Sequence, residues 1–562
     1  MKKMNNWWKK STFYEIYPQS FKDSNDDGIG DINGIIESLD YIKGLGVSGI
    51  WITPIYKSPM VDNGYDISSY TEINPDYGTM SDFDNLLELA HQKNLKIIMD
   101  LVVNHTSDQH HWFKESKKNK NNPYSDYYIW RDPSGDGSAP SNLGSAFGGS
   151  AWEYVPERQQ YYLHLFEKRQ PDLNWESRQL RKDIYSTMKF WLNKGIDGFR
   201  MDSISFISKD PLFQNVEYKN SEGYGAYYIG SANGPKLHAY LQEMNQEILS
   251  NYDVVLIGET PHTTSLQAQK YVDPDRKELN MLFQFDHMHV DYGEFGRYSD
   301  VSYKLSDLRS SMSEWQNNVA WNALYLNNHD QPRSVSRFGD DYNYRKKSAE
   351  MLAVITFLQR GTPFIFQGEE IGMTNCKRLS IDEYQDVEAY NNFENLQKAG
   401  LSDKKALEMI NRKSRDNSRT PMQWNTDKNA GFSNYDPWIS VNPNYKEINT
   451  EKDKKSEDSI YYFYKKLIAI RGKNDVLING SFQLLSEKDS DIFAYIRSLD
   501  NKEVLVIGSF SNKKIKYRVP SKIIKQKSKL LLSNYLIPKH STLETDIYME
   551  PFECLVYQLS SK

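Results

Sequence analysis

The sequence has few of the features that mark secreted or membrane-bound proteins. Its 562 residues include only two cysteines, Cys376 and Cys554, which lie far apart, so a disulfide framework is not expected and the expected location is cytoplasmic. The longest apolar runs, such as residues 351–358, are far shorter than the ~20 residues that cross a bilayer, so no membrane association is expected. The charged start of the chain has no apolar stretch of the kind found in signal peptides.

Other absences narrow the possible partners and cofactors. The net charge is −6, and no tract rich in lysine and arginine with interleaved aromatic residues is present, so nucleic acid is not an expected partner. No His-x-x-x-His pattern or clustered Cys/His spacing indicates a zinc site. The length of the chain predicts two or three domains.

What the sequence does contain is an alternation of short apolar runs and amphipathic stretches. Strands are predicted at residues 13–18, 49–55, 96–103, 198–202, 254–259, 281–285, 323–328 and 363–367, and helices at residues 80–93, 180–194 and 236–249, among others. Eight near-continuous apolar strands separated by helices predict a parallel sheet covered on both faces, and eight strands close a (β/α)8 TIM barrel. A doubly wound open sheet is the alternative, but no phosphate-type glycine turn follows the first strand.

Two segments depart from this alternation and predict additional modules. Residues 104–173 are rich in Asn, Ser, Gly, Pro and aromatic residues, and they are too long for an ordinary barrel connection. We therefore expect an inserted subdomain after the third strand, lying over the site. From residue 481 to 562 the runs become short and strand-like, which predicts a C-terminal antiparallel β-sandwich domain. The catalytic barrel is then expected to comprise residues 1–103 and 174–480.

Four of the predicted strands end in or near a carboxylate, namely Asp100, Asp202, Glu259 and Asp330. A partly buried carboxylate costs several kcal/mol unless it is paired, so this arrangement is rarely explained by packing. The carboxyl ends of barrel strands meet at one face of the molecule, where catalytic groups are found in this architecture. The strand ends therefore predict a site.

The residues around two of these carboxylates suggest which catalytic role each of them has. The strand period of two places Arg200 on the same face as Asp202, and a neighbouring guanidinium favours the ionised carboxylate that a nucleophile requires. A structural ion pair at the strand end is the alternative. Glu259 has no adjacent cation in the sequence, so we expect it to be the protonated acid of a glycosidase pair. His105 and His329 follow strands at the same rim and could donate hydrogen bonds to substrate hydroxyls.

A separate pattern indicates calcium. Oxygen ligands alternate along residues 23–31 as in the loop of an EF-hand, with a glycine at the sixth position. The predicted ligands are Asp23, Asn25, Asp27, the carbonyl of Ile29, and Asp31. The glutamate usual at the twelfth position is absent, since Gly34 stands there, and a metal-free Asp-rich turn is the alternative. We expect the ion to be structural.

Taken together, the motifs resemble those of the α-amylase-type retaining glycoside hydrolases, and within them the oligo-1,6-glucosidase and α-glucosidase branch. The segments that carry the resemblance are residues 7–8, 23–31, 62–66, 100–105, 198–202, 258–259, 327–333, 367–370 and 415–424. They occur in the family order and span nearly the whole chain. No organic cofactor is implied.

The resemblance implies a role for each matching residue. Asp202 would be the nucleophile, Glu259 the general acid and then the base, and Asp330 would bind ring hydroxyls and stabilise the transition state. The side chains lining the glucose subsite would be His105, Arg200 and His329, with Tyr65 as a stacking platform. Asp62 and Arg415 would hold the terminal hydroxyls and close the pocket, which implies removal of single α-glucose units from the non-reducing end.

Several positions depart from the pattern of the branch. The residue after the nucleophile is commonly Val in α-1,6-acting members and Ala or Thr in α-1,4-acting ones, whereas this chain has Ser203. Thr260 stands where Met is frequent, and Asn425 where Asp is usual. Sucrose isomerases carry an arginine-rich loop with no clear match in residues 297–308, and tend to have Asn where Gln331 stands. Trehalose-6-phosphate hydrolases are usually less acidic in the segment matching residues 23–31.

The sequence thus predicts a monomeric enzyme acting on small oligosaccharides, with α-1,6-linked glucose of isomaltose as the expected target. An α-1,4-glucosidase of the maltase or sucrase type is the main alternative, ahead of a trehalose-6-phosphate hydrolase or a sucrose isomerase. A catalytically dead sugar-binding barrel is the non-enzymatic alternative. Such relatives usually lose a carboxylate and often carry a membrane helix, whereas this chain keeps all three acids.

Overall fold

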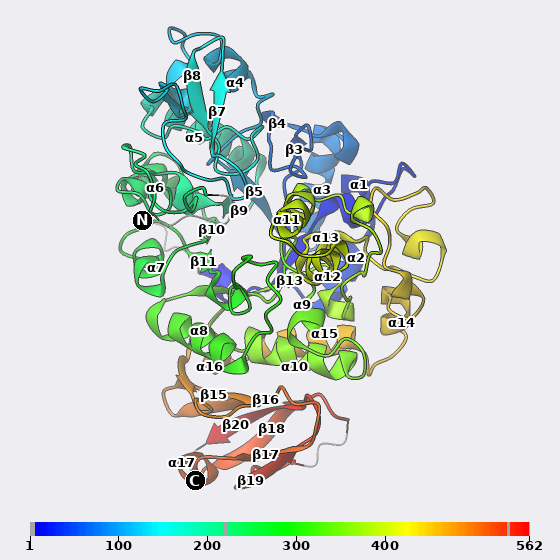
Figure 1. Ribbon diagram of the computed structural model, residues 1–562. Helices are drawn as coiled ribbons and strands as arrows, with labels where there is room; N and C mark the ends of the chain where they lie inside the picture. The colour runs from blue at the N-terminus through cyan, green and yellow to red at the C-terminus, as the bar shows by residue number, and fades with distance from the viewer. Residues whose placement is uncertain (1–5, 218–222, 537–539, 561–562) are drawn as a thin grey trace.

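Eight parallel strands close a barrel at the centre of the molecule (Figure 1). The computed structural model describes residues 6–217, 223–536 and 540–560. The barrel strands are β1 (Phe13–Ile16), β2 (Gly49–Ile52), β5 (Lys96–Val102), β9 (Gly198–Asp202), β10 (Val255–Glu259), β11 (Met281–Phe283), β12 (Asn322–Leu324) and β13 (Gly361–Phe366). Each lies within or overlaps one of the eight predicted strands, so the predicted TIM barrel is confirmed.

The barrel strands are buried because side chains fill the interior and helices cover the outside. Inside, Phe13 stacks on Phe364 with ring centroids 5.2 Å apart, and Phe283 lies 4.7 Å from Phe364 and 5.3 Å from Trp51. Large side chains in layers are the usual filling of such a barrel, which makes it a packed core rather than a pore. This core holds the strand ends above it in fixed positions.

Helices surround the barrel, except those at residues 111–116 and 521–524, which belong to the inserted segment and to the C-terminal module (Figure 1). The helices include every predicted amphipathic stretch. They are α1 (Ile32–Glu37), α2 (Leu39–Leu45), α3 (Met80–Gln92), α4 (His111–Ser116), α5 (Arg178–Lys194), α6 (Leu237–Glu247), α7 (Ser265–Val272), α8 (Leu305–Asn318), α9 (Ser334–Phe338), α10 (Arg345–Phe357), α11 (Val387–Lys398), α12 (Asp403–Lys413), α13 (Asp416–Arg419), α14 (Thr450–Lys454), α15 (Ile460–Gly472), α16 (Asp475–Asn479) and α17 (Ser521–Ile524). Helix α3 begins with a capping box between Thr79 and Asp82, and α5 ends at Gly195, whose φ of 107° suits a left-handed C-cap.

Small antiparallel sheets form the two additional modules. In the predicted insertion, β6 (Trp130–Arg131), β8 (Gln160–Leu163) and β7 (Trp152–Val155) pair in that order, next to a hairpin of β3 (Tyr56–Lys57) and β4 (Ser69–Ile73). After residue 480, one sheet contains β14 (Ser481–Leu484), β15 (Ile492–Leu499), β16 (Lys502–Ser509), β20 (Cys554–Ser560) and β18 (Lys527–Ser533), and β17 (Ile515–Arg518) pairs with β19 (Asp546–Met549). The two-sheet C-terminal module was predicted, whereas the residue boundaries of the domains stay predictions.

Helix α10 joins the barrel to the C-terminal module. Ten of its thirteen residues are buried, from Ser348 to Phe357, because one side contacts β13 of the barrel and the other contacts β16 and β20 (Figure 1). An amphipathic surface helix would bury only one stripe. The burial on both sides shows that the C-terminal sheet covers what would otherwise be the outer face of the barrel.

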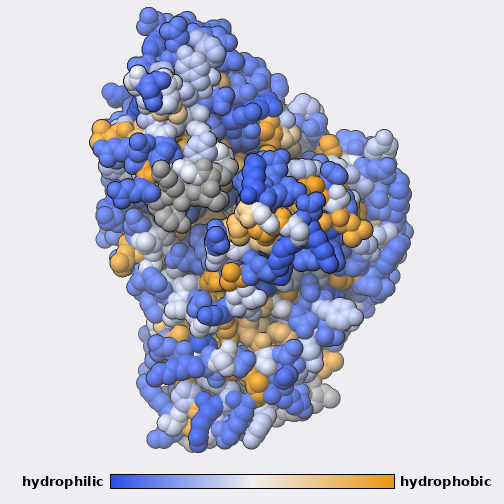
Figure 2. Space-filling model, in the orientation of Figure 1, coloured by the Kyte–Doolittle hydropathy of each residue, from blue (hydrophilic) through white to orange (hydrophobic). Residues whose placement is uncertain are grey.

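The surface and the cysteines have few unusual features. On the face shown in Figure 2, hydrophobic residues are scattered among hydrophilic ones. Within residues 6–217, 223–536 and 540–560, no helix combines the length and the apolar character needed to span a membrane. Cys376 and Cys554 are both buried and unbonded to one another.

Candidate active site

Arg200 holds three carboxylates together at the carboxyl ends of adjacent barrel strands. Its Nη1 atom lies 2.7 Å from Asp100 and 2.6 Å from Asp202, and its Nη2 atom lies 2.9 Å from Glu259. The arginine side chain is 1% exposed, so these bonds are shielded from water. The predicted pairing of Arg200 with Asp202 is present. Glu259 has no adjacent cation in the sequence, but in the fold the neighbouring strand brings the same guanidinium to it.

The environment separates the pKa values of the three candidate acids. Burial raises the pKa of Glu259 to about 7 and that of Asp202 to about 6, against the opposing effect of Arg200. Burial would also raise the pKa of Asp330, but His329 and the neighbouring arginines outweigh it and hold that pKa well below its usual range. At neutral pH the site therefore has two ionised carboxylates and one that is about half protonated. This is the pattern that acid-assisted glycoside cleavage requires.

These pKa values predict a bell-shaped dependence of kcat/KM on pH. Asp202 must lose its proton to act as a nucleophile, so activity should rise through about pH 6. Glu259 must keep its proton to act as an acid, so activity should fall above about pH 7. Because the two groups interact, the apparent pKa values read from the two sides of the pH profile belong to the pair rather than to either residue alone. A profile that stays flat from about pH 5 to about pH 9 would contradict this assignment.

His329 links Asp330 to the first barrel strand. Its Nδ1 atom lies 2.7 Å from Glu15 on β1, and its Nε2 atom lies 3.2 Å from Asp330 and 2.7 Å from the hydroxyl of Tyr65. Burial would lower the pKa of His329, but Asp330 and Glu15 outweigh that effect and raise it to about 9. The cationic form of His329 is therefore favoured. As a cation, His329 fixes the orientation of Asp330.

Tyr65 lies against His329 with one face of its ring. The two ring planes are 7° apart and their centroids are separated by 5.3 Å. Tyr65 was predicted as a stacking platform for sugar, and it is 6% exposed. One face is thus already used by the histidine, and its role toward a sugar stays a prediction.

Asp62 and Arg415 form the predicted pair. Arg415 Nη2 lies 3.2 Å from Asp62, and its Nη1 atom lies 3.4 Å from Asp330. Gln170 donates from its amide to Asp62 at 3.1 Å and lies 3.3 Å from Nε2 of His105. Since Gln170 comes from residues 104–173, the inserted segment reaches the site, as the sequence predicted. The nine predicted catalytic and sugar-contacting residues are therefore gathered around one centre.

Sequence reasoning missed several residues that complete this centre. Asp386 is fully buried and binds Arg415 through two bonds, at 2.5 and 2.9 Å. Glu388 accepts a hydrogen bond from Arg297 and forms an ion pair with Arg415 at 3.3 Å. Both acids lie at the start of α11, in a segment with no strand pattern, so nothing in the sequence pointed to them. Glu15 could have been identified from the sequence, because a carboxylate inside the apolar run of β1 is costly to bury unless it has a partner.

Ser203, which immediately follows Asp202, contacts Glu259 directly. Its backbone N–H donates to Glu259 Oε2 at 2.9 Å, and its hydroxyl lies 3.4 Å from the same atom. The backbone of Ser203 is left-handed, with φ 44° and ψ 34°, a conformation that costs free energy for a residue other than glycine. The strained turn thus aims an N–H group at the candidate acid.

The predicted calcium loop precedes helix α1. Asp23 accepts bonds from three backbone N–H groups of the loop, while Asp31 accepts from the N–H groups of Ser24 and Gly34 and so caps the helix. Carboxylate, amide and carbonyl oxygens are ligands suited to calcium by their chemistry. In the part of the chain that the structure describes, no three His, Cys, Asp or Glu side chains are grouped to hold a metal ion. Calcium binding by this loop stays a prediction.

Calcium should raise the melting temperature if the loop binds it. A ligand that binds only the folded state stabilises by about 2.7 kcal/mol at one hundred times its Kd. The measurement is a thermal melt in excess chelator, then with added Ca²⁺, with Mg²⁺ as the control ion. Superimposable melting curves under all three conditions would rule out a structural calcium site.

Comparison with known proteins identifies the class of the chain. The model of the alpha-amylase catalytic domain matches residues 15–480, so the chain belongs to the alpha-amylase family. It is 50% identical over 560 residues to an oligo-1,6-glucosidase from Parageobacillus thermoglucosidasius, which covers 98% of this chain and 99% of the relative. A trehalose-6-phosphate hydrolase from Bacillus subtilis (strain 168) is 45% identical, covering 99% of this chain and 98% of that protein.

A solved structure confirms the fold at the same level of similarity. The trehalose-6-phosphate hydrolase of Bacillus licheniformis superposes with a TM-score of 0.93 and is 46% identical, covering 99% of this chain and 100% of that chain. The resemblance drawn from the short motifs is thereby confirmed.

Proposed function

We propose that this protein is a retaining, exo-acting α-glucosidase that hydrolyses terminal α-1,6-linked glucose from isomaltose and short isomalto-oligosaccharides. The observation that carries the proposal is the bonding of one buried guanidinium to both Asp202 and Glu259, with Asp330 held beside them by His329. Two close carboxyl groups with separated pKa values are the machinery of retaining glycosidases.

In the first step, a carboxylate oxygen of Asp202 attacks the anomeric carbon as the glycosidic C–O bond breaks. Glu259 gives its proton to the departing oxygen, which leaves as a neutral sugar, and the glucose is left as a β-linked ester of Asp202. In the second step, Glu259 takes a proton from water while that water displaces Asp202. Two inversions restore the α configuration.

The other residues hold the glucose unit during these steps. We assign Asp330 to the ring hydroxyls, because His329 and Arg419, the latter at 2.8 Å, keep it ionised and fixed. Asp62 and Arg415 are assigned to the terminal hydroxyls. An ion pair at 3.2 Å offers both an acceptor and donors at the far end of the subsite, which supports cleavage of one glucose at a time.

The preference for the α-1,6 linkage rests on overall similarity rather than on Ser203. The relative at 50% identity carries the name oligo-1,6-glucosidase, and the trehalose-6-phosphate hydrolase follows at 45%.

Initial rates on isomaltose, maltose, sucrose and trehalose 6-phosphate test the proposal. The highest kcat/KM is expected on isomaltose, with the other three substrates lower. A higher kcat/KM on maltose or sucrose would make the enzyme an α-1,4-type glucosidase instead. A higher value on trehalose 6-phosphate would make the enzyme a trehalose-6-phosphate hydrolase instead. We further propose that the enzyme acts in the cytoplasm as a monomer.

A further inference from the structure

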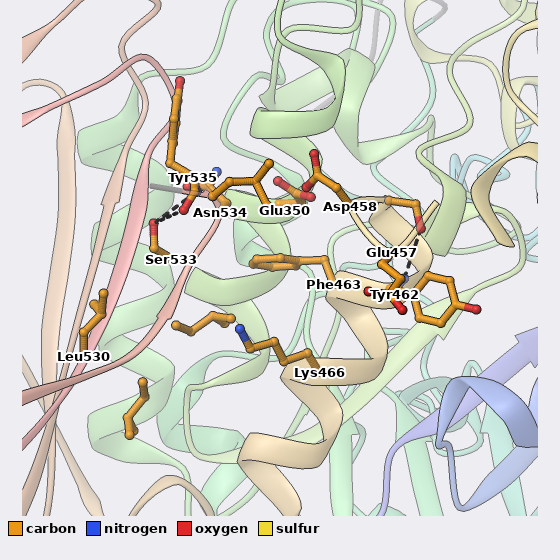
Figure 3. A pocket seen from close by; sticks show the side chains of 14 residues that line it. Glu350, Glu457, Asp458, Tyr462, Phe463, Lys466, Leu530, Ser533, Asn534 and Tyr535 are labelled. Carbon is orange, nitrogen blue, oxygen red and sulfur yellow. Dashed lines mark hydrogen bonds between the residues drawn. The ribbon is translucent and has the colours of Figure 1, made fainter. Parts of the chain in front are cut away.

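A second pocket lies at the junction between the barrel and the C-terminal sheet (Figure 3). Its volume is about 360 Å³, and its walls come from α10, from α15 and its preceding turn, and from β18 and the loop after it. None of the residues that line this junction pocket belongs to the strand ends that carry Asp202 and Glu259. Its size falls within the range of pockets that bind small molecules.

Glu350 provides an unsatisfied acceptor in the junction pocket. Its side chain is 1% exposed, and one oxygen, Oε1, lies 3.0 Å from the ammonium group of Lys346. The other oxygen, Oε2, is buried and has no hydrogen-bond partner in the described part of the chain. Lys347 lies 3.7 Å from it, beyond hydrogen-bond distance, and donates to the carbonyl of Asn534. A buried acceptor without a donor is costly, and a ligand hydroxyl would relieve that cost.

Two residues of α15 supply the complementary features. Lys466 lines the pocket, is exposed, and forms no hydrogen bond or ion pair with the residues that the structure describes, so its ammonium group is available as a donor. Phe463, one turn earlier on the helix, presents a flat ring in the same pocket (Figure 3). An acceptor on α10 facing a donor and an apolar ring on α15 suits a ligand with hydroxyl groups and an apolar face.

The charges around the junction pocket favour a neutral ligand. Three carboxylates line it, those of Glu350, Glu457 and Asp458. Three ammonium groups balance them: Lys466 lines the pocket, and Lys346 and Lys347 lie beside Glu350, Lys346 also binding Asp458 at 2.7 Å. A phosphate would meet the carboxylates, and an organic cation would meet the lysines. Because its charges balance, the pocket has no net charge that would favour either a phosphate or an organic cation.

We propose that the junction pocket binds a neutral sugar about one glucose unit in size, separately from the active site. Glu350 accepts a bond from a sugar hydroxyl, Lys466 donates to another, and the ring of Phe463 packs against the C–H face of the pyranose. Because β18 belongs to the C-terminal sheet and α15 to the barrel, the bound sugar contacts both modules. The choice of glucose as the ligand rests on the proposed function, since glucose would be the product.

The test uses the full-length enzyme and glucose itself. Crystals soaked in glucose should show one pyranose against Phe463, and calorimetric titration should show a second class of site besides the active site. Lys466→Met should weaken that second site by about tenfold, the loss expected for one charge-assisted hydrogen bond. Lys473→Met, an exposed lysine just after α15 and outside the pocket, is the matched control and should leave both sites unchanged.

Glu350→Gln gives an independent readout if its melting temperature shows that it remains folded, and it too should weaken the second site. A single class of glucose site in the wild-type enzyme would overturn the proposal, as would a second site that both variants leave unchanged. Hydrolysis of isomaltose should persist in Lys466→Met. Failure of the junction site would therefore leave the proposed function standing, whereas failure to hydrolyse isomaltose would refute the function without touching the binding result.

Discussion

Replacing Asp202 by asparagine should reduce kcat on isomaltose by about 10⁴-fold or more, the scale seen when an enzyme loses its nucleophile. The amide has nearly the shape of the carboxylate, but it cannot form the glucosyl ester. Its oxygen can still accept from Arg200, whose Nη1 atom lies 2.6 Å from Asp202 in the native site. The geometry around Asp100 and Glu259 is therefore expected to persist.

The same substitution should not destabilise the protein at neutral pH. Burial raises the pKa of Asp202 to about 6, above the value of about 4 in the unfolded chain, so its ionisation lowers stability progressively between these two pH values, and the full cost is present at neutral pH. An uncharged asparagine removes this cost. The checks are kcat by product assay and the melting temperature by calorimetry, with the exposed Asp40→Asn as control. Activity above about 1% of wild type in a correctly folded Asp202→Asn would exclude Asp202 as the nucleophile.

Replacing Glu259 by glutamine should have an effect that depends on the leaving group. Loss of a general acid typically costs about 10² to 10⁴ in rate, and a sugar leaving group needs that acid because its alkoxide is a poor leaving group. An aryl glucoside with an acidic phenol departs without protonation. Its first step should therefore be nearly unaffected, and the covalent intermediate should accumulate because its hydrolysis still needs a base.

The measurement compares kcat/KM of the Glu259→Gln variant on isomaltose and on a nitrophenyl α-glucoside. The alkaline limb of the pH profile, expected near the pKa of about 7, should also disappear on the aryl substrate. An equal loss on both substrates would show that Glu259 positions the site rather than donating a proton.

The sequence was sufficient to predict the barrel because each strand is a short apolar run bounded by polar residues. Strand β9 has the same limits in the structure as in the prediction, Gly198–Asp202. The pairing of Arg200 with Asp202 was also predictable, since two residues on one strand share a face through the period of two. Local periodicity thus explains both successes.

Contacts between segments far apart in the sequence could not be predicted from local periodicity. The bond between Arg200 and Glu259 joins neighbouring strands, and its existence depends on their register, in which Ile257 pairs with Arg200. Asp386 reaches Arg415 from an irregular segment before α11. The junction pocket likewise assembles from segments more than one hundred residues apart, those of Glu350 and Phe463. Such sites follow from packing, which no local pattern encodes.

The stereochemistry of the first product tests the account most directly. The substrate is an isomaltoside methylated at the anomeric oxygen of its leaving sugar, so that only the released glucose can report by proton NMR. Attack by Asp202 followed by attack of water predicts that the α-anomer of glucose appears first and the β-anomer grows in later by mutarotation. Initial appearance of the β-anomer would mean direct displacement by water, and it would contradict the assignment of Asp202 as nucleophile.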